Sequence, residues 1–301
     1  VSHSNLLKEI SVERVRDEFI RILMSNSPKS GIELLDELGL LQYIVPELVK
    51  AKGVKQPQAH AYDVWEHLLR TLQHSADKEW PLEIRLSALF HDISKPETFR
   101  ISHETQHITF YGHEVVGSRV TKKILERMKF PTKLTDKVTK MVRWHMFFSD
   151  TETITLSAVR RMINNVGREN IWDLMNIRIC DRIGTGRPKE NPYRLRKYKA
   201  MIEEAMTDPI SVAMLKTDGK RIMDVTHVTP GPKIGFTLNA LLEEVLENPK
   251  LNNEEYLDKR AVELINLDIK ELESLGRSGE NKKKEAESHN KEEIHKKYHV
   301  S

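Results

Sequence analysis

The chain has little of the chemistry that stabilises a secreted or membrane-bound fold. Its 301 residues include a single cysteine, Cys180, which excludes an intramolecular disulfide and a zinc site built from several thiolates. No stretch approaches the roughly 20 consecutive apolar residues of a membrane helix, and the first residues lack the apolar segment of a secretory signal. We therefore expect a cytoplasmic protein with no membrane partner, in which imidazole and carboxylate groups bind any metal.

An excess of charge of one sign is also missing. The net charge is +3, from 48 basic and 45 acidic residues, and the segment from Arg277 onward holds seven of the basic and five of the acidic ones. The rest of the chain is therefore nearly neutral, and composition alone gives no argument for nucleic-acid binding. With 39% hydrophobic residues, the chain can bury the core of one large domain or two ordinary ones.

Alternating apolar and polar residues are rare, whereas amphipathic helical patterns recur from Val12 to Leu272. These patterns predict an all-α helical bundle, with helices near 12–22, 32–38, 64–76, 82–91, 113–128, 133–147, 170–183, 233–247 and 254–272. The exception is a short β-hairpin, predicted from 98–102 and 107–111 around the polar turn 103–106. The last 25 or so residues are rich in Lys, Glu, Ser and Asn without apolar periodicity, which predicts disorder.

Six histidine and aspartate residues fall on the apolar faces of the predicted helices. They are His67, His91, Asp92, His113, His145 and Asp181. The dipeptide His91-Asp92 means little alone, because a chain with 13 histidines has a fair chance of containing such a pair. A buried polar group without a partner is costly, so several of them together indicate a hydrogen-bonded network or a bound cation.

The residue types favour a metal site. Imidazoles and carboxylates suit Mn, Fe, Co, Ni or Zn, with Mg a further candidate, and four imidazoles with two carboxylates can hold two divalent ions if one carboxylate bridges. Two adjacent ions would activate a water and neutralise charge on a phosphoryl group, the requirements of phosphate-ester hydrolysis. Lys95 could hold the substrate phosphate. The alternatives are a polar network without metal and a solvated Lys95.

The order of these residues resembles the HD-domain superfamily of metal-dependent phosphohydrolases. The motif HDISK at 91–95 lies between His67 and Asp181, and His113 in FYGHEVVGS and His145 in VRWHM are similar to the dinuclear branch. The resemblance implies that His67, His91, Asp92 and Asp181 hold a first ion and that Asp92 bridges to a second one held by His113 and His145. It also implies a helical bundle around the site. We expect Asp92 and Lys95 to be the catalytic residues, Lys95 from its charge and position alone.

A narrower resemblance covers most of the chain. The segments ISVERVRDEFIRIL, LLDELGLLQYIVPEL, FYGHE and PGPKIGFTLNALLEEVLENP are similar to the post-catalytic half of bacterial CCA-adding tRNA nucleotidyltransferases of the HD-containing kind, in the poly(A) polymerase family. This implies a helical RNA-binding segment at 1–50, an HD domain at 51–190, a C-terminal helical body at 191–275 and a disordered charged tail at 276–301. The Gly-Ser motif and the paired Asp-x-Asp of the nucleotidyltransferase head are missing, so we expect part of a longer protein or a processed product.

Two functions from different classes follow from these patterns. The first is a hydrolase of phosphate esters in nucleotides or RNA 3′ ends, and the resemblance implies 2′,3′-cyclic phosphodiesterase, 2′-nucleotidase or phosphatase activity. The alternative is the tRNA-binding portion of a CCA-adding enzyme whose catalytic head is absent. Basic residues at 160–161 and 187–199 could contact an RNA backbone, although solvated helical faces explain them equally well. The oligomeric state is not predicted.

Overall fold

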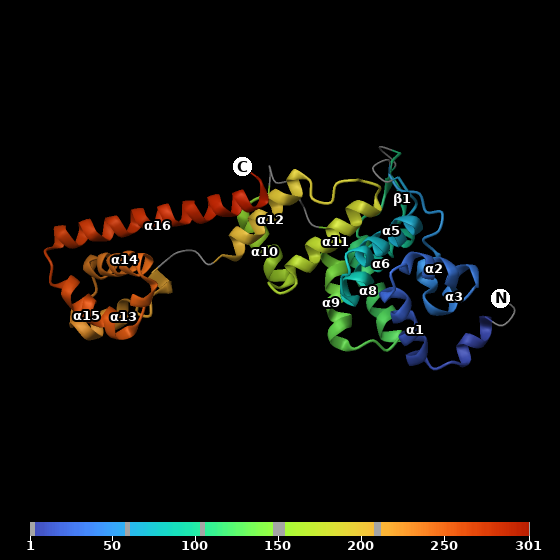
Figure 1. The fold of residues 1–301 in the computed structure, drawn as a ribbon, viewed down its shortest axis with the longest axis horizontal. Helices are drawn as coiled ribbons and strands as arrows, with labels where there is room; N and C mark the ends of the chain where they lie inside the picture. The colour runs from blue at the N-terminus through green and yellow to red at the C-terminus, as the bar shows by residue number, and fades with distance from the viewer. Residues whose placement is uncertain (1–3, 58–60, 103–105, 147–153, 208–211, 301) are drawn as a thin grey trace. The chain divides into compact units, whose positions relative to one another are not determined.

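The computed structural model describes residues 4–57, 61–102, 106–146, 154–207 and 212–300. Helices make up nearly all of this regular structure, and one two-stranded sheet accompanies them (Figure 1). The predicted all-α class with a short hairpin is therefore confirmed. Contacts divide the chain into two compact units, residues 1–199 and 200–301. The predicted division into four segments stays a prediction.

The first unit contains all six predicted metal ligands. Its elements are η1 (Ser4–Glu9), α1 (Val12–Met24), α2 (Pro28–Glu37), α3 (Leu41–Ile44), α4 (Pro46–Val49), α5 (Val64–Asp77), α6 (Leu82–Phe90), α7 (Lys95–Thr98), β1 (Arg100–Ile101), β2 (Ile108–Thr109), α8 (His113–Arg127), α9 (Thr132–Trp144), α10 (Leu156–Val166), α11 (Ile171–Gly184) and the start of α12 (Tyr193–Met206). The predicted helices at 64–76, 82–91, 113–128 and 170–183 correspond closely to α5, α6, α8 and α11.

One hydrophobic core joins the N-terminal helices to the helices that follow. Phe19 and Leu23 of α1 belong to the same buried cluster as Leu68 of α5, Leu86 of α6 and Leu125 of α8. Each of these side chains is at most 1% exposed, so each contributes about 1.5–3 kcal/mol of burial free energy. The helices around the site are therefore held in place by packing with residues 12–49.

Hydrogen bonds fix two of the helix ends near the site. Asp63 caps α5, because its side chain accepts from the Glu66 backbone N–H at 2.8 Å. Arg85 of α6 is buried and donates to the carbonyl oxygens of Leu23 and Ser25, at 2.8 and 2.9 Å. These carbonyl groups at the end of α1 have no partner within the helix, so Arg85 stabilises the contact between the two helices.

The hairpin is shorter than the sequence predicts. Its strands pair antiparallel, with Arg100 opposite Thr109 and Ile101 opposite Ile108. Three residues of the predicted turn, 103–105, lie outside the described residues. The second strand ends four residues before His113.

The second unit has its own core. It contains the end of α12, η2 (Val212–Met214), α13 (Gly219–Thr226), α14 (Pro232–Glu247), η3 (Pro249–Leu251), α15 (Glu254–Ile265) and α16 (Ile269–Tyr298). Side chains from α13, α14 and α15 pack with Leu272 of α16 in one cluster. The helix predicted at 254–272 is in fact two helices, because α15 ends at Ile265 and α16 begins at Ile269. Asp268 caps α16, since its side chain accepts from the Lys270 backbone N–H at 2.9 Å.

The segment from 276 differs from its predicted disorder, because α16 continues to Tyr298. Glutamate and lysine are good helix formers and need no apolar periodicity to continue a helix. At the far end, Lys297 and Tyr298 bond to the carboxylate of Glu203, at 2.8 and 2.7 Å. Although α16 is long, no helix in the described part of the chain is apolar enough to cross a bilayer.

Candidate metal centre

Five helices deliver the six predicted ligands to one buried place in the first unit. His67 comes from the first turns of α5 and Asp181 from the last turns of α11, while His113 begins α8. His91 and Asp92 directly follow α6, and His145 directly follows α9. All six are at most 7% exposed. The structure therefore brings together all the residues that the sequence places on apolar faces.

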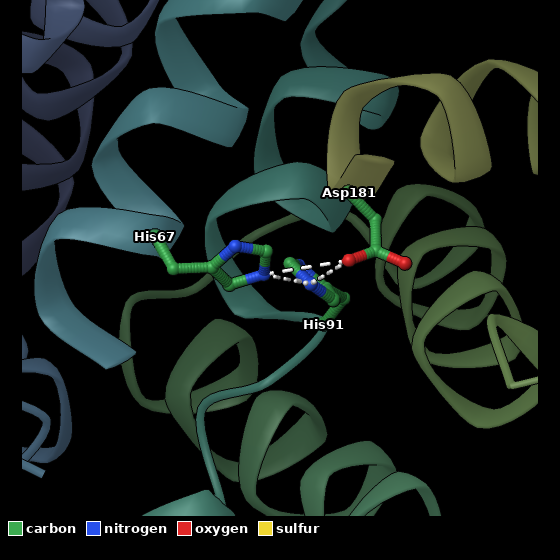
Figure 2. A group of neighbouring side chains, drawn as sticks. All are labelled: His67, His91 and Asp181. Atoms are coloured by element: carbon green, nitrogen blue, oxygen red, sulfur yellow. Dashed lines mark hydrogen bonds and ion pairs between the residues drawn. The ribbon is translucent and has the colours of Figure 1, made fainter. Parts of the chain in front are cut away.

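The first group of ligands is His67, His91 and Asp181, which point toward one another (Figure 2). The Nε2 atoms of the two histidines are 2.9 Å apart. The Oδ1 atom of Asp181 lies 3.5 Å from Nε2 of His67 and 3.8 Å from Nε2 of His91. Three potential ligand atoms thus surround one point.

The second group is Asp92, His113 and His145. Oδ1 of Asp92 lies 3.1 Å from Nε2 of His113 and 3.5 Å from Nε2 of His145. Its other oxygen, Oδ2, lies 3.2 Å from Nε2 of both His67 and His91. The Asp92 carboxylate therefore lies between the two groups, with one oxygen toward each.

Backbone carbonyl groups orient three of the imidazoles. Nδ1 of His91 lies 2.9 Å from the carbonyl oxygen of Ala88. Nδ1 of His113 lies 2.7 Å from the carbonyl oxygen of Phe110, and Nδ1 of His145 lies 2.7 Å from that of Val142. Since a carbonyl oxygen only accepts, each Nδ1 must donate its proton, and Nε2 of each ring is then the atom that faces the centre. Metal-binding histidines are commonly oriented in this way.

This tautomer tests the fit of a metal. Nε2 of His113 and Nε2 of His145 lie 3.3 Å apart, but two neutral rings with protonated Nδ1 atoms cannot hydrogen bond through Nε2. A cation between the two lone pairs removes this conflict. The donor set of imidazoles and carboxylates therefore fits divalent ions better than it fits a self-contained polar network.

The electrostatics also favour positive charge at the centre. Burial would lower the pKa of His91, but the Asp92 and Asp181 carboxylates raise it to about 10. Burial would raise the pKa of Asp92, yet Lys95 and the neighbouring imidazoles hold it well below its usual range. Burial similarly opposes ionisation of Asp181, but His91 and Arg178 keep its pKa low. Two ionised carboxylates in a buried site attract a cation.

Lys95 is buried beside Asp92, so the alternative of a solvated lysine, left open by the sequence, is wrong. Its side chain is 7% exposed, and Nζ lies 2.5 Å from Oδ2 of Asp92. It also donates to Oε1 of Gln56 at 2.6 Å, and the ring of Phe110 lies 5.4 Å away. Lys95 begins the short helix α7. Its ammonium group is therefore fixed beside the Asp92 oxygen that faces His67 and His91.

A cavity of about 1070 Å³ reaches the ligands. Asp92, His113, His145 and Asp181 line it together with Lys95. Some faces of the buried ligands are thus accessible to a small molecule, which a purely structural metal site does not require.

Sequence reasoning missed several residues around the ligands. Gln56 lies 39 positions before Lys95 and carries no local signal. Arg178 pairs with Asp181, and both Arg178 and Arg182 line the cavity. These two arginines are four residues apart on the helix that carries Asp181. This spacing places both of them on one face of that helix and could have been read from the sequence.

Gly184 allows α11 to approach α5. A Cβ atom at this position would overlap the Thr71 hydroxyl and lie 2.9 Å from the His67 carbonyl oxygen. The two ligand-bearing helices are therefore in close contact beside His67 itself.

Comparisons with known proteins agree with this architecture. Residues 1–52 match the family described as the probable RNA and SrmB-binding site of polymerase A, and residues 64–192 match the HD domain. A CC-adding tRNA nucleotidyltransferase of Thermus thermophilus is 35% identical over 239 residues, which are 78% of this chain and 53% of the relative. An A-adding tRNA nucleotidyltransferase of Deinococcus radiodurans is 31% identical over 77% of this chain and 54% of the relative.

A third relative is the multifunctional CCA protein of Neisseria meningitidis, 29% identical over 64% of this chain and 47% of the relative. The chain spans about half the length of these curated relatives. Both family matches and the two predicted resemblances point the same way. The chain therefore belongs to the tRNA nucleotidyltransferase and poly(A) polymerase family, and it carries that family's RNA-binding segment followed by an HD domain.

Proposed function

We propose that the chain is a metal-dependent phosphohydrolase that acts on phosphate esters of nucleotides or RNA 3′ ends. One observation carries the proposal: Asp92 places one carboxylate oxygen toward each of two groups of ligands, at the edge of an accessible cavity. Activity as a 2′,3′-cyclic phosphodiesterase, 2′-nucleotidase or phosphatase belongs to the same proposal.

The ligands divide between two ions. His67, His91, Asp92 and Asp181 would hold the first, while Asp92, His113 and His145 would hold the second. Divalent ions bound there supply a water acidic enough to act as a nucleophile at neutral pH and positive charge for the phosphoryl oxygens.

Two cationic side chains would position the ester. Lys95 has its ammonium group fixed by Asp92 and Gln56, and it lines the same cavity. Arg178 is bound to Asp181, lines the same cavity and is a third exposed. Both can donate to non-bridging phosphate oxygens without a change of position in the backbone, which favours binding of a phosphate over a neutral ester.

The test is hydrolysis by the chain after removal of metal with EDTA and readdition of Mn²⁺, Co²⁺, Ni²⁺, Zn²⁺ or Mg²⁺. Substrates are 2′,3′-cyclic nucleotides, 2′-nucleotides and a generic aryl phosphate. We expect activity that requires metal and that Asp92→Asn lowers by at least 1000-fold, because the amide cannot supply the bridging charge.

Asp173→Asn is the matched control. Asp173 lies on the same helix as Asp181, but it pairs with Lys137 at 2.7 Å and does not line the cavity. Its variant should keep its activity. The proposal is excluded if no added metal produces hydrolysis, or if the hydrolysis persists in Asp92→Asn.

A second candidate function is supported by the match at residues 1–52, described as an RNA-binding site, and by relatives named for their action on tRNA. In this proposal the chain binds tRNA for a nucleotidyltransferase head and has no chemistry of its own. A cytoplasmic location agrees with both proposals, because the proposed substrate and the proposed binding partner are both RNA or its components. Filter binding of tRNA in the presence of EDTA, together with the hydrolysis assays, separates the two proposals.

A further inference from the structure

The cavity wall carries a second group of charged residues beyond the metal ligands. Arg182 lies on α11, Arg187 follows that helix, and Tyr193 and Arg194 begin α12. Tyr111, just before α8, lines the same cavity. None of these residues is needed for the metal centre or for the contacts of Lys95.

The carboxylates of the cavity already have partners. Asp92 is paired with Lys95 and Asp181 with Arg178, and Glu114 lies 3.8 Å from Arg143. Within the described ranges, no carboxylate lies within 4.0 Å of the guanidinium groups of Arg182, Arg187 or Arg194, although Nε of Arg182 donates to the Lys189 carbonyl at 2.6 Å. Three positive charges in the cavity are therefore not balanced by an ion pair.

These like charges affect one another. Arg178, Arg182 and Arg187 line the same cavity, so their positive charges repel one another. Such repulsion is relieved when an anion binds between the cations. Ions at the metal ligands would add still more positive charge. A single phosphate bound at the centre would therefore leave the positive charges of the arginines on the wall uncompensated.

Two tyrosines add exposed aromatic surface to this basic wall. Tyr111 is 85% exposed and Tyr193 is 40% exposed. Nζ of Lys197 lies 6.0 Å from the centre of the Tyr193 ring. Basic grooves that include exposed aromatic rings are typical of single-stranded nucleic-acid binding, in which cations contact phosphates and bases stack on the rings.

The cavity extends from the metal ligands to this wall, because both Asp92 and Arg194 line it. Its volume, about 1070 Å³, is at the upper limit of the roughly 300–1,000 Å³ of pockets that enclose one small ligand. A ligand that fills the cavity would therefore contact both the metal ligands and the basic wall.

We infer that Arg182, Arg187, Arg194 and Tyr193 form a subsite for a second phosphate and its base. The substrate is accordingly the 3′ end of an RNA at least two nucleotides long, rather than a free mononucleotide. Hydrolysis of this substrate rests on the function proposed above, whereas its binding at the subsite does not.

The experiment measures binding and turnover separately. Isothermal titration calorimetry of the EDTA-treated full chain compares adenosine 2′,3′-cyclic phosphate with the trinucleotide ApApA carrying the same cyclic end. We expect at least tenfold tighter binding of the trinucleotide. The same two compounds are then assayed for hydrolysis with metal, where kcat/KM should show a similar preference.

The double variant Arg187→Ala/Arg194→Ala should erase this preference and leave binding of the mononucleotide within about twofold. Both residues are exposed, so the variant should fold, and its melting curve checks this. The matched control is Arg119→Ala, an exposed arginine on α8 outside the cavity. Tyr193→Ala should weaken binding of the trinucleotide only. Tyr193→Phe should bind the trinucleotide as tightly as the native chain, because stacking needs the ring and not the hydroxyl.

Four outcomes are decisive. Equal binding of the two nucleotides, or equal loss for both in the double variant, overturns the subsite. Equally tight binding of a tri-aspartate peptide overturns it too, because the wall would then be a general anion surface. A trinucleotide preference without any hydrolysis supports the subsite while the proposed hydrolase function fails.

Discussion

The buried carboxylate of Asp92 contacts five other residues of the site. One of its oxygens lies near His113 and His145, while the other lies near His67, His91 and Lys95. A buried carboxylate with so many neighbours cannot be replaced without leaving other polar groups unpaired. This single side chain therefore connects the two groups of ligands and the proposed phosphate-binding lysine.

Replacing Gly184 with alanine should disturb His67. The added Cβ would overlap the Thr71 hydroxyl and crowd the His67 backbone, so we expect Gly184→Ala to destabilise the fold by about 1–3 kcal/mol. The displaced imidazole should also weaken metal binding at the first group. Urea unfolding and a metal titration measure the two effects.

Gly235→Ala is the control for this prediction. Gly235 lies in α14, and an added Cβ would meet nothing within 4 Å. Alanine there should leave stability unchanged or raise it by up to about 1 kcal/mol, because it is the better helix former. Equal stability of Gly184→Ala and the native chain would contradict the close packing of α5 on α11.

Lys95→Met should separate catalysis from metal binding. It removes an ammonium group that lies 2.5 Å from Asp92 and competes there for the carboxylate. We expect metal affinity to stay equal or rise, while kcat falls about 10- to 100-fold because a charged hydrogen bond to the phosphate, worth roughly 1.5–3 kcal/mol, is lost.

Steady-state kinetics at saturating metal and a competition assay with a metal chelator test this pair of effects. Lys122→Met, at an exposed position of α8 that pairs only weakly with Glu126 at 3.8 Å, should change neither. Loss of metal together with activity in Lys95→Met would mean that Lys95 supports the ligands rather than the substrate.

At the scale of elements, the contact between α4 and α8 joins the N-terminal helices to the HD helices. Arg127 donates to both oxygens of Glu47, at 2.7 and 2.9 Å. Burial raises the pKa of Glu47, but the hydrogen bonds and charge of Arg127 outweigh it and hold the pKa below its usual value of 4.5. The ionised carboxylate is thus stabilised in the folded chain.

This lowered pKa predicts a pH dependence. A folded-state pKa below the unfolded value gives stability that is complete above about pH 4.5 and is lost as the pH falls through the folded pKa. Glu47→Gln should therefore reduce the free energy of unfolding by about 0.5–1 kcal/mol at pH 7. The difference from the native chain should shrink as the pH is lowered from 4.5 to 3, measured by urea unfolding of EDTA-treated protein.

The helices and the ligand types were predictable because both depend on local periodicity. His67, His113 and Asp181 lie at helical spacing from apolar residues, and the structure buries all three. The role of Gln56 depends on a contact across 39 residues, which no local pattern reports. The continuation of α16 beyond 275 was missed because this part has no apolar periodicity and because its contacts with Glu203 join residues far apart in the sequence.

At the scale of the whole molecule, two family segments are part of one compact unit. The RNA-binding match at 1–52 and the HD match at 64–192 both lie within residues 1–199, and they share a hydrophobic core. A candidate metal site in the unit that also matches an RNA-binding family agrees better with the proposed hydrolysis at an RNA end than with hydrolysis of an unrelated ester. The proposed hydrolysis depends most on whether the six buried ligands hold metal.

The most direct test is the number of divalent ions retained per chain, measured by inductively coupled plasma mass spectrometry after incubation with Mn²⁺ or Zn²⁺ and desalting. We predict about two ions for the native chain, about one for His113→Ala and close to none for Asp92→Asn, because Asp92 contributes to both groups. A native chain that retains no ion, or an Asp92→Asn variant that retains as many as the native chain, would contradict the dinuclear centre.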